Sequence, residues 1–329
     1  MVARRHRARG EAQRRRRLRG DVDPVRDEAR PRVRRAPRVG GCDREGAAHR
    51  AARSGARTRA GGAAAPEADG GSTVKDLFSI EGKVALVTGG SRGIGLMIAR
   101  GYAEHGARVY VSSRSADACA ETAAELSKLG TCTALPADLS QHAEVKRLAG
   151  ELAAREPALH ILVNNAGANW GAPIEEYPDA AWDKVLALNV KAIFHLTVAL
   201  LPQLAAAATP EDPARVINVG SIDGIQVPLL ETYAYSASKA AVHHMTRVLA
   251  KKLASRDITV NAVAPGPFQS KMMAATLEKF GDSIAKTNPR KRIGAPEDMA
   301  GVAIYLASRA GAYVTGAVIP VDGGLSTTK

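Results

Sequence analysis

Residues 83–95 read KVALVTGGSRGIG and are the strongest indicator of architecture in the chain. The first half is a short apolar run typical of a buried strand, and the second half is a glycine-rich turn. A helical pattern follows from Gly93 to Glu104. Glycines in such a turn let the backbone approach a pyrophosphate closely, while the N-terminus of the helix offers free N–H groups. The stretch therefore predicts a dinucleotide-binding site at the start of a βαβ unit.

The alternation of strand and helix continues to the end of the chain. Further strands are expected at residues 108–112, 132–136, 159–163, 215–219, 258–263 and 317–321. Helices are expected at residues 116–129, 141–155, 179–206 and 296–306, and one that carries Tyr235 should run to about residue 254. Apolar strands separated by helices are typical of a parallel sheet buried on both faces, with right-handed crossovers. We therefore expect an α/β fold: a single Rossmann-like, doubly wound domain with a seven-stranded parallel sheet and helices on both faces.

The composition changes near residue 73. Residues 1–72 hold 20 Arg, 9 acidic residues and no Lys, so they carry +11 of the net charge of +13. They show no hydrophobic periodicity and cannot bury enough apolar surface to offset the entropy lost on ordering. We expect residues 1–73 to be a disordered Arg-rich extension and residues 74–329 to form the folded NAD(P)-binding domain.

Three interpretations of the Arg-rich extension compete. Such an arm is able to bind nucleic acid or anionic lipid. An organelle transit peptide would be poorer in acidic residues and richer in Ser. We favour a start codon set too far upstream, because Arg, Ala and Gly without Lys, Phe, Tyr, Ile or Asn are typical of GC-rich DNA translated without selection for folding. Val74 is then the candidate natural start, and nucleic acid is not an expected partner.

Several classes of protein are disfavoured by what the sequence lacks. No apolar run has the length of a membrane span or the form of a secretory signal, so we expect a cytoplasmic protein with no membrane partner. Cys42, Cys119 and Cys132 lack the spacing of metal or redox motifs, and no His has a ligand partner at metal-binding spacing, so no metal is expected. No Gly-x-Ser-x-Gly nucleophile motif occurs.

The end of the second predicted strand indicates which dinucleotide binds. Enzymes that use NAD usually carry an acidic residue here, where it holds the ribose 2′-hydroxyl. In this chain Ser113 and Arg114 follow the strand, and Arg92 of the glycine-rich turn can lie near the same pocket. Two guanidinium groups and a hydroxyl suit a 2′-phosphate, although solvated surface arginines are also common. We therefore expect NADPH/NADP+ as the cofactor in preference to NADH.

Tyr235 and Lys239 stand four residues apart, and Ser221 precedes them. Residues i and i+4 share one face of a helix, so the phenol and the ammonium should point the same way. A nearby ammonium favours the phenolate, so we expect Lys239 to lower the pKa of Tyr235 toward neutral pH and make it a catalytic acid and base. The pair alone occurs by chance in many proteins, but its combination with Ser221 and the dinucleotide turn favours a catalytic role.

From about Leu77 to Leu325 the chain resembles the short-chain dehydrogenase/reductase family. The matching motifs, in the family's order and spacing, are the turn 88–95, the run 164–167, Asn189, Ser221, Tyr235 with Lys239, and Pro265-Gly266. Within the family the chain is most similar to 3-oxoacyl-(acyl-carrier-protein) reductases of the branch associated with rhamnolipid synthesis, through residues 76–79, 169–171 and 312–316. The resemblance implies an NAD(P)-dependent oxidoreductase that acts on CH-OH donors.

The resemblance also implies a role for each matching residue. Tyr235 would deliver a proton to the carbonyl oxygen, Lys239 would lower the pKa of Tyr235 and bind the nicotinamide ribose, and Ser221 would polarise the carbonyl. Asn189 would hold a water that links Lys239 to solvent. The implied cofactor site consists of Gly89, Ser91, Arg92, Gly93, Ile94, Gly95, Ser113, Arg114, Asp138, Leu139, Asn165, Ala166, Gly167, Tyr235, Lys239, Pro265, Gly266 and Ser270. Taken singly, Asp138 could be only a helix N-cap and Asn165 only a turn residue.

The expected reaction is NADPH-dependent reduction of a 3-oxoacyl thioester, on acyl-carrier protein or CoA, to the 3-hydroxyacyl form. Residues 272–292 should form a lid whose wall contains Met272, Met273, Leu277 and Phe280. His195 stands where carrier-protein reductases often have an arginine, so a sugar, polyol or polycyclic alcohol is the alternative substrate. A non-catalytic dinucleotide-sensing regulator is the alternative of another class. The resemblance implies a homotetramer, or a homodimer, built on the helix from residue 179 and the Tyr235 helix.

Overall fold

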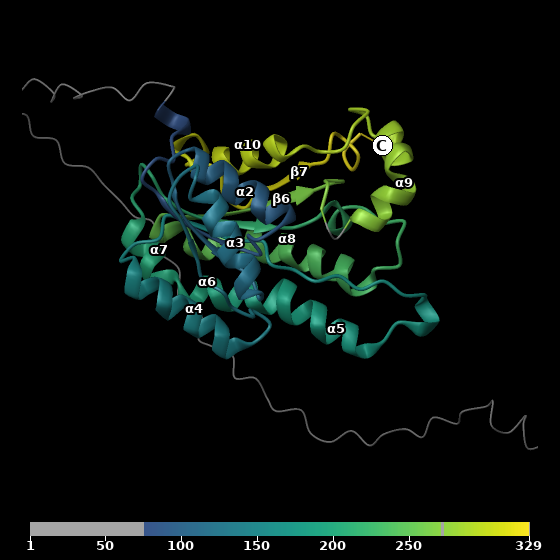
Figure 1. Ribbon diagram of the computed structural model, residues 1–329, viewed down its shortest axis with the longest axis horizontal. Helices are drawn as coiled ribbons and strands as arrows, with labels where there is room; N and C mark the ends of the chain where they lie inside the picture. Colours follow the sequence, from purple (N-terminus) through teal and green to yellow (C-terminus); the bar gives the residue numbers. More distant parts are fainter. Residues whose placement is uncertain (1–75, 271–272, 329) are drawn as a thin grey trace, which may run out of the picture. The chain divides into compact units, whose positions relative to one another are not determined.

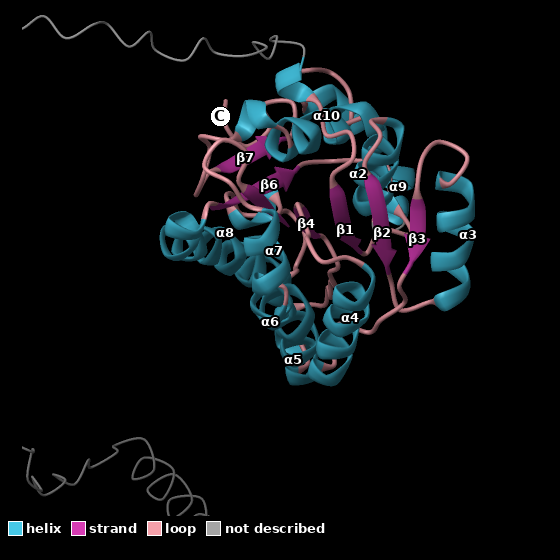
Figure 2. Ribbon diagram, turned by 90° about the vertical axis from the view of Figure 1, so that its left-hand side faces the viewer, coloured by secondary structure: helices cyan, strands magenta, loops and turns pink. Residues whose placement is uncertain are grey.

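The computed structural model describes residues 76–270 and 273–328. They form a parallel sheet with helices on both faces (Figure 1, Figure 2). The strands follow the order β3-β2-β1-β4-β5-β6-β7, and every pair is parallel. Their bounds are β1 Val84–Thr88, β2 Arg108–Ser112, β3 Cys132–Ala134, β4 Ile161–Asn164, β5 Ala214–Val219, β6 Ile258–Pro265 and β7 Val318–Val321. The predicted α/β fold class is confirmed, whereas the Arg-rich extension and the boundary at residues 73 and 74 lie outside the described residues.

The helices divide between the two faces of the sheet (Figure 2). One face carries α2 (Gly93–Glu104), α3 (Ala116–Leu126) and α10 (Pro296–Ala307). The other carries α4 (His142–Arg155), α6 (Ala192–Ala199), α7 (Leu201–Ala207) and α8 (Tyr233–Leu253). Alternate strand residues therefore enter different cores: Ala85 and Val87 pack with the first group, and Val84 and Leu86 pack with the second. All five residues of β1 are buried, which explains its continuous apolar run.

The single helix expected at residues 179–206 is wrong. The structure divides it into α5 (Asp179–Leu186), a π-helical turn (Ala187–Lys191), α6 and α7, and the axis bends by 57° before α7. Pro202 lies in the first turn of α7, where it cannot donate the backbone bond that would continue α6. No single helix in the described part of the chain is long and apolar enough to cross a membrane; only the bent pair Asp179–Ala199 and Leu201–Ala207 passes on length and composition.

The carboxyl ends of the strands gather the polar motifs at one edge of the sheet. The chain order reverses at β1, whose neighbours are β2 and β4, and open α/β sheets bind their ligands beyond the strand ends at such a reversal. The glycine-rich turn follows β1, Asn165 follows β4, Ser221 follows β5, and Gly266 follows β6. Parallel pairing thus brings together motifs that are far apart in the sequence.

Candidate active site

The glycine-rich turn has the backbone that its sequence predicts. Gly89 and Gly93 adopt positive φ values of 62° and 55°, a region that side chains other than glycine rarely occupy. A Cβ on Gly95 would collide with the carbonyl oxygen of Gly89 and with the amide of Asn165. The turn is therefore a cradle that only bare backbone can form, open at the N-terminus of α2, and it fits the pyrophosphate of a dinucleotide.

Thr88 and Asn165 fix the turn to the end of β4. The Thr88 hydroxyl accepts hydrogen bonds from the backbone N–H groups of Asn165 at 3.0 Å and Ala166 at 3.1 Å. The side-chain amide of Asn165 donates to the carbonyls of Thr88 at 2.9 Å and Gly89 at 3.1 Å. Asn165 is thus more than the simple turn residue that its type allows, because it bridges two strands.

The ends of the paired strands β2 and β3 bring Ser113 and Arg114 close to Asp138. The N–H of Ala137 donates to the carbonyl of Ser113 at 3.0 Å, and Asp138 accepts from the backbone and hydroxyl of Ser140 at 3.1 and 2.8 Å. Asp138 does not cap α4, whose N-cap is Gln141, so the N-cap alternative is wrong. The side chains of Arg92 and Arg114 are exposed, and neither forms an ion pair within residues 76–270 and 273–328. Both guanidinium groups remain available to an anion.

The segment after β6 returns to the same turn. The N–H of Gly266 donates to the carbonyl of Val321 at 3.0 Å, and a Cβ on Gly266 would lie 2.6 Å from Cβ of Asp322. A Cβ on Gly93 would lie 3.2 Å from Cβ of Ser270. Ser270 therefore packs against the glycine-rich turn.

Tyr235 and Lys239 occupy one face near the start of α8, as predicted. Lys239 Nζ lies 5.5 Å from the centre of the Tyr235 ring and donates to the carbonyl of Val219 at 2.7 Å. The Ser221 hydroxyl accepts from the N–H of Asp223 at 3.1 Å and lies close enough to the Tyr235 phenol to lower its pKa. A serine hydroxyl, a phenol and a buried ammonium thus meet at the ends of β5 and β6.

The expected lowering of the Tyr235 pKa toward neutral pH is wrong. Burial raises the pKa of Tyr235 to about 12, the Ser221 hydrogen bond acts in the opposite direction, and the Asp223 carboxylate raises it further. Burial also lowers the pKa of Lys239 to about 8, against the opposing effect of Asp223. Low polarity favours the neutral form of each group, and the ammonium does not overcome it.

Two groups behind Ser221 were not predicted: a half-buried carboxyl, Asp223, and a buried imidazole, His243. Burial raises the pKa of the Asp223 carboxyl, while Lys239 lowers it. His243 is buried, its Nε2 has no partner among the described residues, and burial beside Lys239 lowers its pKa to about 4. A Cβ on Gly220 would collide with this imidazole, and one on Gly224 would lie 2.9 Å from its Cε1. The glycines on either side of Ser221 are the sequence signal for this close packing.

Asn189 lies in the π-helical turn, a feature that is frequent at functional sites. Its amide donates to the carbonyl of Ala168 and to the Ser238 hydroxyl, both at 2.9 Å, and its oxygen accepts from the N–H of Ala168 at 2.8 Å. These bonds tie the segment after β4 to α8 and occupy the side chain. Because the side chain is occupied, a water bound at Asn189 would have to hydrogen-bond to its backbone.

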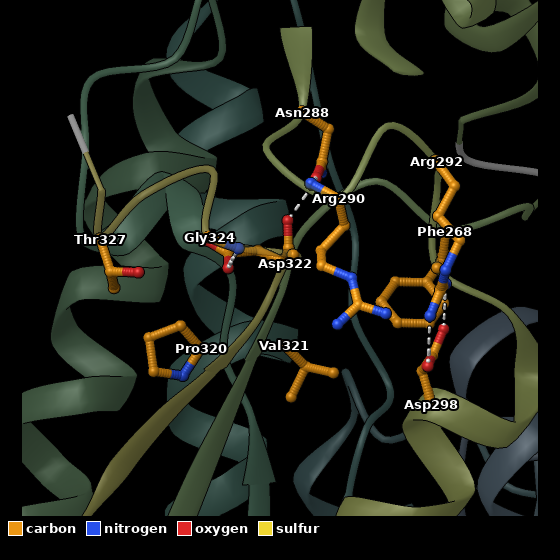
Figure 3. Close-up of a pocket in the computed structure, with 12 residues that line it drawn as sticks. Phe268, Asn288, Arg290, Arg292, Asp298, Pro320, Val321, Asp322, Gly324 and Thr327 are labelled. Carbon is orange, nitrogen blue, oxygen red and sulfur yellow. Dashed lines mark hydrogen bonds and ion pairs between the residues drawn. The ribbon is translucent and has the colours of Figure 1, made fainter. Parts of the chain in front are cut away.

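A cavity of about 780 Å³ lies beside the Ser221 turn and was not predicted. We call it the side pocket; its wall contains Ile174, Tyr177 and Trp182 from one segment, and Val227, Leu229 and Leu230 from the segment between Ser221 and α8. A second cavity, of about 380 Å³, lies at the end of β7, where Arg292 pairs with Asp298 and the amide of Asn288 donates to the carbonyl of Asp322 (Figure 3). Ser221, Tyr235 and Lys239 do not line the second cavity. The predicted lid contains α9 (Ala274–Thr287), and its role stays a prediction.

Comparison with known proteins decides the family. Residues 89–326 match a family model described as enoyl-(acyl carrier protein) reductase, adh_short_C2. The chain is 52% identical over 252 residues to the rhamnolipids biosynthesis 3-oxoacyl-(acyl-carrier-protein) reductase of Pseudomonas aeruginosa, a match that covers 75% of this chain and 97% of that protein. The chain belongs to the short-chain dehydrogenase/reductase family. It is accordingly an oxidoreductase of that family.

A solved structure and a further relative extend this comparison. A solved RhlG/NADP active-site complex from Pseudomonas aeruginosa superposes with a TM-score of 0.74 at 50% identity, covering 76% of this chain and 99% of that one. A gluconate 5-dehydrogenase from Gluconobacter oxydans is 34% identical over 257 residues, which cover 77% of this chain and 98% of that protein. Similar chains therefore include both an acyl-carrier-protein reductase and a sugar-acid dehydrogenase.

Proposed function

We propose that this protein is an NADPH-dependent reductase that converts a 3-oxoacyl thioester into the 3-hydroxyacyl thioester. The observation that carries the proposal is the meeting of Ser221, Tyr235 and Lys239 beside a cradle for a dinucleotide. Similarity to the 3-oxoacyl reductase and to the NADP complex supports this substrate and cofactor. The exposed guanidinium groups of Arg92 and Arg114 support NADPH over NADH, because both suit a 2′-phosphate.

The bound cofactor would supply a hydride to C3 of the substrate. Tyr235, protonated at neutral pH because its pKa is about 12, donates its phenolic proton to the carbonyl oxygen. Ser221 hydrogen-bonds the same oxygen and orients it. Lys239, held by the Val219 carbonyl at 2.7 Å, stabilises the phenolate that remains and returns a proton to it. The products are the 3-hydroxyacyl thioester and NADP+.

The test is NADPH oxidation at 340 nm with a 3-oxoacyl thioester, comparing the wild type with Tyr235→Phe. Loss of the general acid should lower kcat by about 10²- to 10⁴-fold. NADPH binding, followed by its fluorescence, should survive because the glycine-rich turn is intact. Tyr305→Phe on α10, outside the site, is the matched control and should keep wild-type activity. If wild type and Tyr235→Phe behave alike on every carbonyl offered, the alternative of a non-catalytic dinucleotide sensor replaces the enzyme.

A further inference from the structure

The side pocket adjoins the proposed active site, although Ser221, Tyr235 and Lys239 do not themselves line it. Asp223 lines the pocket, and its N–H donates to the Ser221 hydroxyl at 3.1 Å. Ser236 also lines the pocket and directly follows Tyr235 on α8. A substrate whose carbonyl meets Ser221 and Tyr235 can therefore extend its remaining part into the pocket.

Aromatic contacts hold the far wall of the pocket in place. The Tyr177 ring stacks edge-on with Tyr233 at 5.2 Å and with Trp182 at 6.1 Å between ring centres. The Tyr177 hydroxyl accepts from the N–H of Ala234 at 3.2 Å and donates to the carbonyl of Trp170 at 3.3 Å. The wall is thus fastened to the first turn of α8, next to Tyr235. A preformed apolar wall of this kind suits a small-molecule site.

The charges of the pocket are of one sign. Asp223 and Glu231 are carboxylates, and no Lys, Arg or His is among the described residues that line it. Glu231 accepts from the Tyr233 hydroxyl at 2.9 Å, so its carboxylate is held at the wall. Val227 and Leu229 are 93% and 104% exposed, which leaves apolar surface at the rim in contact with water. A hydrocarbon would gain by covering this surface, whereas an anion would lose hydration and meet two like charges.

We propose that the side pocket binds the uncharged hydrocarbon chain of the substrate, and that Asp223 and Glu231 exclude substrates that carry a carboxylate at this end. The inference rests on the proposed function, whose substrate class it narrows. Alkyl 3-oxoacyl thioesters have an uncharged chain that fits this pocket, whereas keto sugar acids carry the carboxylate that it excludes. Glu231 and Asp223 are specificity-determining residues in this scheme.

A series of 3-oxoacyl N-acetylcysteamine thioesters tests the chain-binding part. With chains of 4, 6, 8 and 10 carbons, kcat/KM should rise about threefold for each methylene that the pocket buries. An analogue of the 8-carbon substrate with a terminal carboxylate should be about tenfold poorer than the neutral substrate of equal length, since one like-charge contact of about 1.4 kcal/mol gives that factor.

Two variants at exposed positions test whether the negative charge of the pocket excludes a substrate carboxylate. Glu231→Gln keeps an acceptor for Tyr233 and should raise kcat/KM several-fold for the carboxylate analogue alone. Leu229→Lys should improve that analogue further and weaken the 10-carbon substrate. Glu211→Gln removes an exposed carboxylate outside the pocket and is the matched control. Equal kcat/KM for neutral and carboxylate substrates, unchanged by both variants while reduction still depends on Tyr235, would overturn the inference but leave the proposed function standing. No reduction of any thioester would remove the proposed function itself.

Binding can be followed without turnover through Trp182, which lines the pocket. The chain has two Trp residues, so Trp170→Phe leaves Trp182 as the sole reporter. Its emission should change as 3-hydroxydecanoyl N-acetylcysteamine is added, and the apparent Kd should rise in Leu229→Lys. An emission that responds to dilution of the protein and not to the ligand would assign the pocket to a second copy of the chain and overturn the inference.

Discussion

Burial favours the neutral forms of Tyr235 and Lys239. The pKa of Tyr235 rises to about 12, and that of Lys239 falls to about 8. A phenol that is protonated at neutral pH is the form that a reductase needs before it donates a proton. Asp223 raises the pKa of both groups, so one carboxylate, absent from the motif that identifies the pair, adjusts the whole site.

Asp223→Asn tests this adjustment through the pH profile. Removing the carboxylate takes away a contribution that raises both pKa values, so both should fall. The alkaline limb of kcat/KM for reduction should then move to lower pH, because the Lys239 ammonium and the Tyr235 phenol both lose their protons at lower pH. Glu211→Gln should leave the profile unchanged. A profile that keeps its position and loses only height would assign Asp223 a purely structural role.

Arg114 is the side chain proposed to contact the 2′-phosphate of NADPH. It is exposed and has no ion pair within the described residues, so its loss should not affect folding. Arg114→Ala should raise the Kd for NADPH about tenfold, as expected for one charge-assisted contact, and leave the Kd for NADH unchanged. Fluorescence titration measures both constants, with Arg100→Ala on α2 as the control. An equal loss for both cofactors would contradict a 2′-phosphate contact.

Among the elements, the β1–turn–α2 unit depends on glycine inside its helix. Gly95 lies inside α2, where alanine is normally favoured, yet its Cβ would meet the carbonyl of Gly89 and the amide of Asn165. Gly150 lies inside α4 with nothing within 4 Å of its would-be Cβ. The two positions share a residue type and a helical setting but differ in free space.

Alanine substitution at these two positions should therefore have opposite effects. Gly95→Ala should cost about 1–3 kcal/mol of unfolding free energy and weaken NADPH binding, because the turn must move. Gly150→Ala should add about 0.5–1 kcal/mol, since alanine lowers the entropy cost of the helix. Urea denaturation gives both values. A destabilised Gly150→Ala, or a Gly95→Ala with wild-type stability and binding, would show that free space around the Cβ does not decide the effect of alanine in these helices.

The buried strands and the glycine-rich turn could be predicted from sequence, because apolar runs and glycine carry local signals. The bend before α7 could have been found from Pro202, but the apolar pattern of residues 179–206 concealed it. The side pocket could not be found this way, because Ile174 and Leu229 come together only in the folded chain. The predicted lowering of the Tyr235 pKa was wrong for a similar reason. The spacing in the sequence reveals the neighbouring ammonium but not the burial of the phenol.

The association of this chain into a homodimer or homotetramer stays a prediction. Phe194 and Val198 on α6 and Val248 on α8 are 44%, 44% and 47% exposed, and these helices are the ones expected to build the homodimer or homotetramer.

At the amino-terminal edge of the sheet, an ionic cluster connects segments that are far apart in the sequence. There Asp212 pairs with Lys83 at 2.7 Å and with the fully buried Arg215 at 3.0 Å. Arg215 also donates to the carbonyls of Leu306 and Ser308, so the cluster joins β1, β5 and the end of α10.

Asp212→Asn should destabilise the molecule without disturbing its site. The change leaves Lys83 and Arg215 buried without a carboxylate, and breaking a buried pair is costly because the remaining charge keeps its desolvation penalty. Asp212 is itself 32% exposed, so we expect a loss of about 2–4 kcal/mol of unfolding free energy. Glu125→Gln breaks the exposed pair with Lys128 and should cost less than about 1 kcal/mol. Because the cluster lies at the amino ends of the strands and the active site at their carboxyl ends, the Kd for NADPH should stay at its wild-type value. Equal stability losses for the two variants in urea denaturation, or a cofactor affinity that falls with Asp212→Asn, would contradict this separation of stability from function.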